Sequence, residues 1–226
     1  MDHSSGAPTQ RIRRFLILAT LLAAAAIPYA AAQVAGKDYR VIDPPQPADS
    51  GARVEVLEFF WYGCPHCNNM QPSLKRWLKR KPADVEFKRV PAVLSESWIP
   101  HTRLFYTLEA LGLTDRLHQD VFAAIHEQQL RLQDPRILAD WIAKRGVDRQ
   151  KFMDAYNSFG IQSRVQRAIE MTRNYNIPGT PAVTVDGKYL TAPSMTLKPD
   201  NSIDYDRYYQ VLDQVIAISR KSRVAK

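Results

Sequence analysis

The two cysteines of this chain are separated by two residues, and the chain contains no others. They stand in the segment Phe59-Phe60-Trp61-Tyr62-Gly63-Cys64-Pro65-His66-Cys67. With this spacing a dithiol can close into a small disulfide ring and reopen without rearranging the fold. An apolar run at 54–61 precedes the pair and a helix-like stretch at 65–80 follows it, which is the setting of a redox motif. We therefore predict thiol–disulfide chemistry at Cys64 and Cys67.

A structural disulfide and a zinc site are the alternatives for the same cysteines. A bridge across two residues constrains the unfolded chain little. A structural zinc site needs about four ligands, and a second cysteine pair is missing. His118 and His126 are eight positions apart on an expected helix and so lie on roughly the same face. This spacing could place two metal ligands together, but we favour a solvent-exposed helix face. We expect no metal and no cofactor beyond the redox-active disulfide.

Bulk composition places the chain among ordinary globular proteins. It has 226 residues, of which 45% are hydrophobic and 24% are charged. These values argue against disorder, and the length suits one domain or one domain with a large insertion. A core of this size does not need a cross-link, which favours chemistry over structure for the cysteines.

The first 32 residues have the pattern of an export signal. Arg11, Arg13 and Arg14 precede an apolar run at 15–27, and Ala30-Ala31-Ala32 offers a cleavage site before Gln33. The run is short for a membrane span, which needs about 20 residues, although an uncleaved anchor is the alternative. We expect cleavage after Ala32 and a location in the oxidising bacterial periplasm.

The chain is basic, with a formal net charge of +8. Nucleic acid is one class of partner that such an excess suggests, but export argues against it. A basic stripe with interleaved aromatic residues is also missing from the sequence. We interpret the charge as a solvated surface and expect no nucleic-acid partner.

The pattern of apolar residues predicts a βαβ unit, an all-helical stretch and a ββα unit. Asp186-Gly187 predicts a hairpin turn, and Pro72 predicts a kink because proline lacks the N–H of a helical residue. Helix ends are expected at Gly112, Asp134-Pro135, Gly146 and Gly160. The expected strands are 39–42, 54–61, 85–90, 182–185 and 188–191, and the expected helices are 65–80, several within 101–175, and 204–219.

Three motifs resemble the DsbA family of periplasmic thiol–disulfide oxidoreductases: Leu57-Glu58-Phe59-Phe60, Cys64-Pro65-His66-Cys67 and Gly179-Thr180-Pro181. The resemblance covers nearly all of the chain after the signal. It implies an α/β, thioredoxin-like fold with an all-helical domain inserted between the βαβ and ββα halves. The implied domain limits are 1–32 for the signal peptide, 33–94 and 176–226 for the two halves, and 95–175 for the insertion.

The resemblance also implies a dithiol oxidase that gives its disulfide to newly exported cysteine-containing proteins. A quinone-linked membrane oxidase of the DsbB type would reoxidise it. A reductase, an isomerase or a specialised thiol partner is the alternative within the class, and a non-catalytic peptide-binding chaperone is the alternative outside it. Isomerases of this kind carry an extra dimerisation domain, for which too few residues lie between Gln33 and the strand at 54–61. We expect a monomer.

The catalytic set predicted here is Cys64, Cys67, His66, Pro65 and Glu58. Cys64 would sit at a helix N-cap, where free N–H groups and the helix dipole favour a thiolate. The His66 imidazole would support that thiolate, and Pro65 would stiffen the link between the sulfurs. Stabilising the charged, reduced form makes the disulfide a stronger oxidant.

The remaining site residues rest more heavily on the resemblance. It implies that Thr180-Pro181 is a cis bond packed against the cysteines, with Thr180 offering backbone groups to a bound peptide. It also implies that Glu58 is a buried acid that helps move the Cys67 proton, whereas Glu55 points to the other face of the strand. Trp61 and Tyr62 adjoin the motif and are expected to line a peptide-binding patch. The tryptophans expected in the core are Trp77, Trp98 and Trp141.

Overall fold

A computed structural model describes Met1 and residues 35–224. Contacts between residues divide the chain into two units, 1–32 and 33–226. The expected signal peptide and its cleavage point lie outside the described residues apart from Met1, and the described helices and strands belong to the second unit. Within the described part, no helix is both long enough and apolar enough to cross a membrane.

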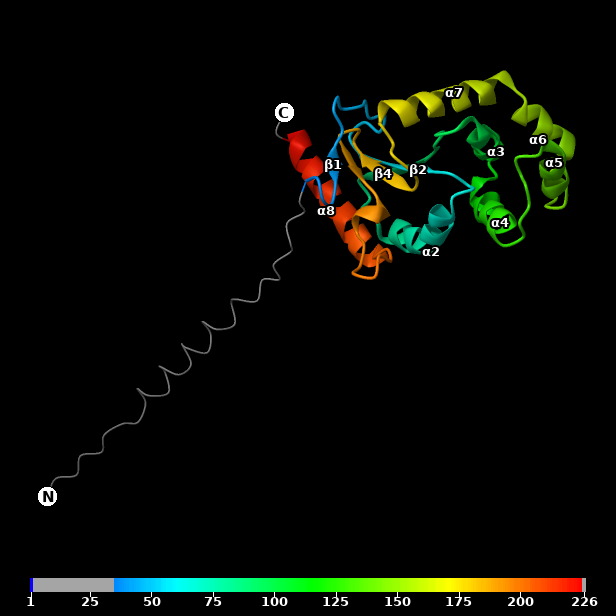
Figure 1. Cartoon of the computed structure of the whole chain (residues 1–226). Helices are drawn as coiled ribbons and strands as arrows, with labels where there is room; N and C mark the ends of the chain where they lie inside the picture. The colour runs from blue at the N-terminus through cyan, green and yellow to red at the C-terminus, as the bar shows by residue number, and fades with distance from the viewer. Residues whose placement is uncertain (2–34, 225–226) are drawn as a thin grey trace. The chain divides into compact units, whose positions relative to one another are not determined.

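Five strands form one mixed sheet in the order β1-β5-β4-β2-β3 (Figure 1). Strand β2 lies between β3, which runs parallel to it, and β4, which runs antiparallel. The β4–β5 and β1–β5 pairs are also antiparallel. The bounds are β1 (Arg40–Val41), β2 (Val54–Phe60), β3 (Val85–Pro91), β4 (Ala182–Val185) and β5 (Tyr189–Thr191).

Strand β2 is buried along its whole length, as its continuous apolar run predicts. Side chains alternate between the two faces of a strand. Val54 and Val56 pack in one core cluster and Leu57 and Phe59 in another. By the same alternation Glu58 lies on the face of Val54 and Val56.

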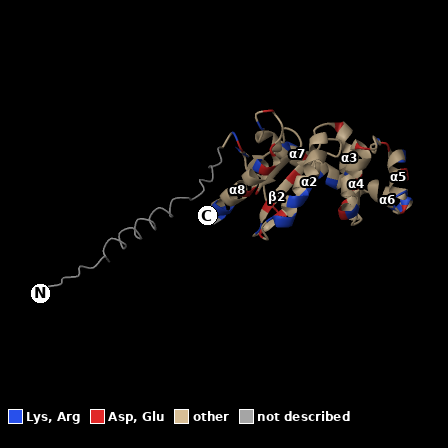
Figure 2. Cartoon of the chain, turned by 90° about the horizontal axis from the view of Figure 1, so that it is seen from below, with Lys and Arg blue, Asp and Glu red and all other residues tan. Residues whose placement is uncertain are grey.

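Helices α2 (Pro65–Arg80) and α8 (Tyr205–Val224) cover that face. Met70 and Trp77 of α2 pack with Tyr208 and Leu212 of α8 against the valines of β2 and β4. Helix α2 carries basic residues and no acidic ones, and Figure 2 shows them along its exposed side. No carboxylate in its first turn therefore opposes a negative charge at its N-terminus.

The segment between β3 and β4 is helical, as predicted. Its elements are the 3₁₀ helix η1 (Glu96–Trp98), α3 (Ile99–Ala110), α4 (Thr114–His126), α5 (Pro135–Ala143), α6 (Arg149–Tyr156) and α7 (Phe159–Asn174). A second 3₁₀ helix, η2 (Pro193–Met195), follows β5. Strand β4, which follows the insertion, pairs with β2, which precedes it, so the two halves share one sheet. This is the thioredoxin-like arrangement with a helical insertion, while the limits 33–94, 95–175 and 176–226 stay predictions.

Three of the four predicted helix ends are confirmed. Gly112 and Gly146 have positive φ angles just beyond α3 and α5. Asp134 caps α5, and its carboxylate accepts from the N–H groups of Arg136 and Ile137. Gly160 is the exception, because Ser158 caps α7 and places this glycine inside the first turn.

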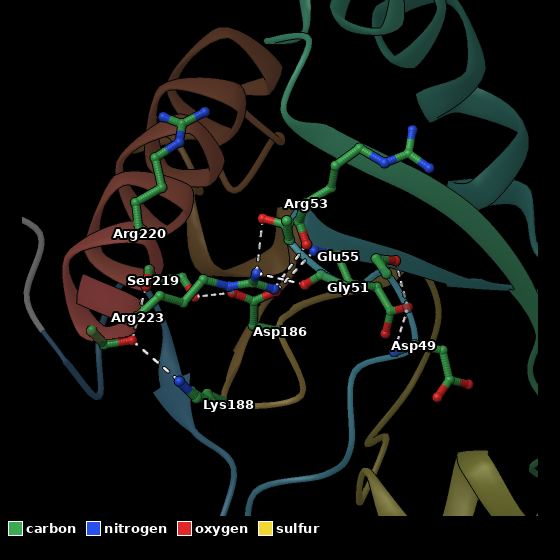
Figure 3. Close-up of polar contacts among 12 residues, drawn as sticks. Asp49, Gly51, Arg53, Glu55, Asp186, Lys188, Ser219, Arg220 and Arg223 are labelled. Carbon is green, nitrogen blue, oxygen red and sulfur yellow. Dashed lines mark hydrogen bonds and ion pairs between the residues drawn. The ribbon is translucent and has the colours of Figure 1, made fainter. Parts of the chain in front are cut away.

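An ion pair between the partly exposed Arg223 and the buried Asp186 joins the end of α8 to the hairpin between β4 and β5 (Figure 3). Asp186 begins the predicted turn with a φ of 51° and accepts from the backbone N–H of Glu55 at 2.8 Å. Arg223 donates two hydrogen bonds to the Asp186 carboxylate, at 2.6 and 2.5 Å. Its remaining donors reach the carbonyls of residues 51–53. One side chain thus joins three segments of the sheet domain.

Candidate active site

Cys64 lies at the N-cap of α2, where the chain turns out of β2. Its backbone is extended (φ −85°, ψ 117°), and its N–H bonds the Trp61 carbonyl at 3.0 Å. Pro65 occupies the first helical position, where its missing N–H costs nothing and its fixed φ suits the helix. The first turn of α2 therefore points its free N–H groups toward the Cys64 sulfur.

The Cys64 thiol is 7% exposed and has a pKa lowered to about 5. The largest cause is a hydrogen bond from the Cys67 thiol, which outweighs the opposing effect of burial. The Thr180 side chain and the backbone N–H groups of Cys67 and His66 add to the lowering. Hydrogen bonds to the charged form favour that form, so reduced Cys64 is a thiolate at neutral pH.

The Cys67 thiol has the opposite environment. It is fully buried, and burial together with the neighbouring Cys64 raises its pKa far above the ordinary value. Both cysteines are in the free, reduced form in this structure. The two sulfurs are therefore unequal, because Cys64 favours the thiolate and Cys67 the protonated thiol.

The loop before β4 closes the other side of the site. The Thr180–Pro181 bond is cis, and the Thr180 carbonyl oxygen lies 3.3 Å from the Cys64 sulfur. A cleft of about 350 Å³ opens beside it. Its wall includes His66, Pro178, Thr180, Pro193, Leu197 and Ile203. The cleft therefore adjoins the active site through Thr180, whose carbonyl contacts Cys64.

His66 is exposed at the mouth of this cleft. Its backbone N–H is one of the groups that form a hydrogen bond with the Cys64 sulfur. Support of the thiolate by the imidazole stays a prediction.

Glu58 is a fully buried carboxyl beneath the cysteines. Burial raises its pKa, while the Arg89 guanidinium and the Gln71 amide oppose that effect. The Nε of Arg89 lies 3.1 Å from Oε2, but neither carboxyl oxygen completes a well-aligned hydrogen bond among the described residues. The charge of Glu58 also raises the pKa of Cys67, so the two groups interact.

The family is identified by comparison with known proteins. A family model described as "DSBA-like thioredoxin domain" matches residues 89–199. The thiol:disulfide interchange protein DsbA of Burkholderia cepacia is 45% identical over 167 residues, which cover 74% of this chain and 79% of that protein. DsbA of Bordetella parapertussis is 42% identical over 207 residues, covering 91% of this chain and 96% of its own. This chain belongs to the DsbA family.

Solved DsbA structures agree with this assignment. The crystal structure of Pseudomonas aeruginosa DsbA matches with a TM-score of 0.76 and 35% identity, covering 84% of this chain and 96% of the other. As a DsbA-family member the protein is a thiol:disulfide oxidoreductase. In this family the redox group is a disulfide rather than a bound cofactor. Among the described residues, no cluster of three or more His, Cys, Asp or Glu side chains could hold a metal.

Tyr62 was predicted to line a peptide surface, and the structure contradicts this. Its side chain is 1% exposed and packs against Phe60 and Phe122. The hydroxyl pairs with Nδ1 of His118 at 2.8 Å, and the carbonyl pairs with Nε2 of His126 at 2.8 Å. We remove Tyr62 from the substrate-binding set. His118 is buried as well, so its expected place on a solvated helix face is also wrong.

Trp61 is half-buried and stacks on Trp98, with ring centroids 4.2 Å apart and planes at 1°. The stack lies over Gly63, where an added Cβ would come within 2.3 Å of the Trp61 ring. Trp77 and Trp141 are core residues as predicted, whereas Trp98 is half-buried.

Sequence reasoning missed Gln71 and Arg89, which both contact the Glu58 region. The helical period offered a signal for Gln71, because a residue four positions after Cys67 lies on the same face of α2. A polar residue on that apolar face is unusual. Arg89 had no such signal, since its pairing with Glu58 depends on the register between β2 and β3.

Proposed function

We propose that this DsbA-family protein works mainly as an oxidase that transfers its Cys64–Cys67 disulfide to newly exported cysteine-containing proteins. The observation that carries the proposal is the contrast between a stabilised Cys64 thiolate and a buried, protonated Cys67. Stabilising the thiolate stabilises the reduced enzyme, which makes the disulfide more oxidising. A reductase would need the opposite bias.

Transfer begins when a client thiolate attacks the Cys64 sulfur of the oxidised enzyme. A client–Cys64 disulfide forms, the Cys64–Cys67 bond breaks, and Cys67 leaves with a proton from Glu58. A second client thiolate then attacks the client sulfur. The client leaves oxidised, and Cys64 leaves as its stabilised thiolate, which is a good leaving group. Two electrons pass from the client to the enzyme.

The other site residues have supporting roles in this proposal. Pro65 sets the first turn of α2, and His66 borders the cleft beside the thiolate. The backbone of Thr180 pairs with an extended client segment, and Pro181 holds that segment over Cys64. Trp61, stacked on Trp98, contributes apolar surface near the motif. Apolar surface suits clients that are still unfolded.

The cycle closes when another protein reoxidises the dithiol. We propose a DsbB-like quinone-linked membrane oxidase for this step, and a monomeric enzyme in the periplasm after cleavage behind Ala32. The resemblance of the motifs to periplasmic DsbA proteins supports both points. The domain limits 33–94, 95–175 and 176–226 belong to the same proposal.

The redox equilibrium of the purified protein with reduced and oxidised glutathione tests the direction of transfer. We expect a potential well above the value of thioredoxin, about −270 mV. A value at or below it would contradict the oxidase and favour a reductase. Refolding of a reduced client by a Cys64→Ser, Cys67→Ser variant tests the chaperone alternative, because an oxidase loses this activity without its cysteines.

A further inference from the structure

Helices α2 and α4 are in contact (Figure 1). Two hydrogen-bonded polar side chains lead from the surface of α4 to the buried Cys67 of α2. Gln71 is 4% exposed, and its Nε2 donates to the Cys67 carbonyl at 3.1 Å. Its Oε1 accepts from Nε2 of Gln119 at 2.9 Å. Gln119 belongs to the helical insertion and is exposed. The insertion thus reaches the active-site helix through two amide side chains.

The partners of Gln71 permit only one orientation of its amide. The Cys67 carbonyl can only accept, and it takes the hydrogen bond of the N–H side at 3.1 Å. The Glu58 carboxylate forms no well-aligned hydrogen bond, but the Gln71 amide lowers its pKa, which also requires the N–H side to face it. Gln119 presents a donor to the other side and therefore requires the oxygen there. A flipped Gln71 would place its oxygen against two acceptors, which is unfavourable.

We propose that Gln71 and Gln119 form a positioning pair that keeps the N–H side of the Gln71 amide toward Cys67 and Glu58, and so assists transfer of the Cys67 proton to Glu58 during reoxidation. This inference rests on the proton-transfer role proposed above for Glu58. Neither glutamine contacts a client or exchanges a proton itself.

Reoxidation is the half-reaction in which an ionised Glu58 is required. The Cys64 thiolate first attacks an external disulfide, whose S–S bond breaks: one external thiolate leaves, and the other sulfur forms a mixed disulfide with Cys64. Cys67 then gives its proton to the Glu58 carboxylate and attacks the Cys64 sulfur. The Cys64–Cys67 bond forms, and the external thiolate leaves. In client oxidation Glu58 instead acts in its protonated form, so the two half-reactions need opposite states of one carboxyl.

The surroundings of Glu58 show why a single amide matters. Arg89 of β3 is the cation that pairs with the Glu58 carboxylate. Cys67 of α2 is close enough for the charge of Glu58 to raise its pKa. Tyr62 and, from α8, Tyr208 and Tyr209 are buried hydroxyls whose pKa values are raised, so they stay neutral. Burial raises the pKa of Glu58, and Arg89 and Gln71 are what hold it down. Losing the Gln71 donor would leave Arg89 alone in that role.

Gln119→Glu tests the proposal because a carboxylate at 119 can only accept. It would draw the N–H side of Gln71 away from Glu58. We expect reoxidation of the reduced protein by glutathione disulfide to slow about tenfold at neutral pH, because the ionised Glu58 would lose the amide dipole that favours its charged form. Oxidation of a dithiol peptide by the disulfide form should stay within about twofold, because that step uses protonated Glu58.

The new charge at 119 also acts on Glu58 directly, so the same change is made in a Gln71→Met background. In that background we expect Gln119→Glu to slow reoxidation clearly less than it does in the wild-type protein, since only the direct effect of the charge remains. Equal slowing in both backgrounds would overturn the positioning pair. Equal slowing of both half-reactions would overturn it too, because structural damage has that signature.

Glu58→Gln separates this inference from the role of Glu58. Slower reoxidation in Glu58→Gln supports that role. Wild-type rates in both half-reactions would contradict it. A ¹³C NMR titration of the Glu58 carboxyl then reports on the glutamines alone. If the pKa of Glu58 is higher in the single variant Gln119→Glu than in the double variant Gln71→Met, Gln119→Glu, the result supports the positioning pair. If the two pKa values are equal, the result excludes the pair.

Discussion

The Cys64 sulfur lies 3.3 Å from the carbonyl oxygen of Thr180, a residue 116 positions further along the chain. The Thr180 side chain also helps to lower the pKa of Cys64. A residue of the cis-proline loop therefore acts on the nucleophile through its side chain while its backbone faces the peptide cleft. If clients bind in this cleft as proposed, Thr180 links the reactivity of Cys64 to client binding.

Thr180→Val should make the enzyme a weaker oxidant. The substitution keeps the shape and the carbonyl but removes a hydroxyl that stabilises the thiolate, so the pKa of Cys64 should rise. A hydrogen bond to a charged group is worth ~1.5–3 kcal/mol, so the equilibrium with glutathione should shift about tenfold toward the disulfide form. Thr184→Val is the control, because the buried Thr184 hydroxyl has no partner in the described structure. A shift of the same size in both variants would contradict the role of Thr180.

The stability of the reduced protein should depend on pH through Cys64. Its pKa is about 5 in the folded protein, against an ordinary value of 9.0. A lowered pKa in an acid contributes stability above the unfolded value, and this stability declines as pH falls from 9 toward 5. We expect the advantage of the reduced over the oxidised form in urea unfolding to shrink over this range and to level off below pH 5. A constant difference from pH 9 to pH 5 would show that the thiolate is not stabilised.

Gly63→Ala should destabilise the protein by about 1–3 kcal/mol, the usual cost of overpacking. The added Cβ would lie 2.3 Å from the Trp61 ring, which cannot move without disrupting its stack on Trp98. Thermal unfolding measures the loss, and tryptophan fluorescence reports on the stack. Gly160→Ala is the matched control, since its nearest neighbour would be 3.9 Å away. Within α7 it should stabilise by ~0.5–1 kcal/mol.

Arg223→Met should cost about 3 kcal/mol in the free energy of unfolding, because it leaves the carboxylate of Asp186 buried without its cation (Figure 3). Arg220→Met is the control. Its partner Asp84 is half exposed, and such pairs contribute about 0–1 kcal/mol.

Acid should reduce the difference between wild type and Arg223→Met. Burial alone would raise the pKa of Asp186, but the hydrogen bonds of Arg223 and Ser219 lower it overall. The stabilisation is therefore present at neutral pH and lost below about pH 4. A difference that persists undiminished at pH 2–3 would mean that Arg223 acts through packing alone.

Local patterns predicted most of the fold. The Ala182–Val185 strand and the Pro65–Arg80 helix have the predicted bounds, because a turn residue, a proline or a change of period marks each end. The cis bond before Pro181 was implied by family resemblance, since no local signal distinguishes a cis proline.

The errors concern residues whose environment depends on distant segments. Tyr62 follows a strand that is buried on both faces, so alternation could not tell which way it points. Its partner His118 is 56 residues away. The Glu58–Arg89 and Gln71–Gln119 contacts likewise join separate elements. Sequence patterns identified the reactive groups, and only the folded chain identified the groups that tune them.

The insertion of the helices between β3 and β4 determines when the site can form. Residues 56–59 of β2 pair with residues 182–185 of β4, so the centre of the sheet cannot form before a segment more than a hundred residues later in the chain is present. Such distant pairing folds slowly. Because synthesis runs from the N-terminus, Cys64 and Cys67 are made long before Thr180 and α8 can enclose them. The newly made chain is therefore, for a time, an unfolded dithiol of the kind proposed above as a client of the folded enzyme.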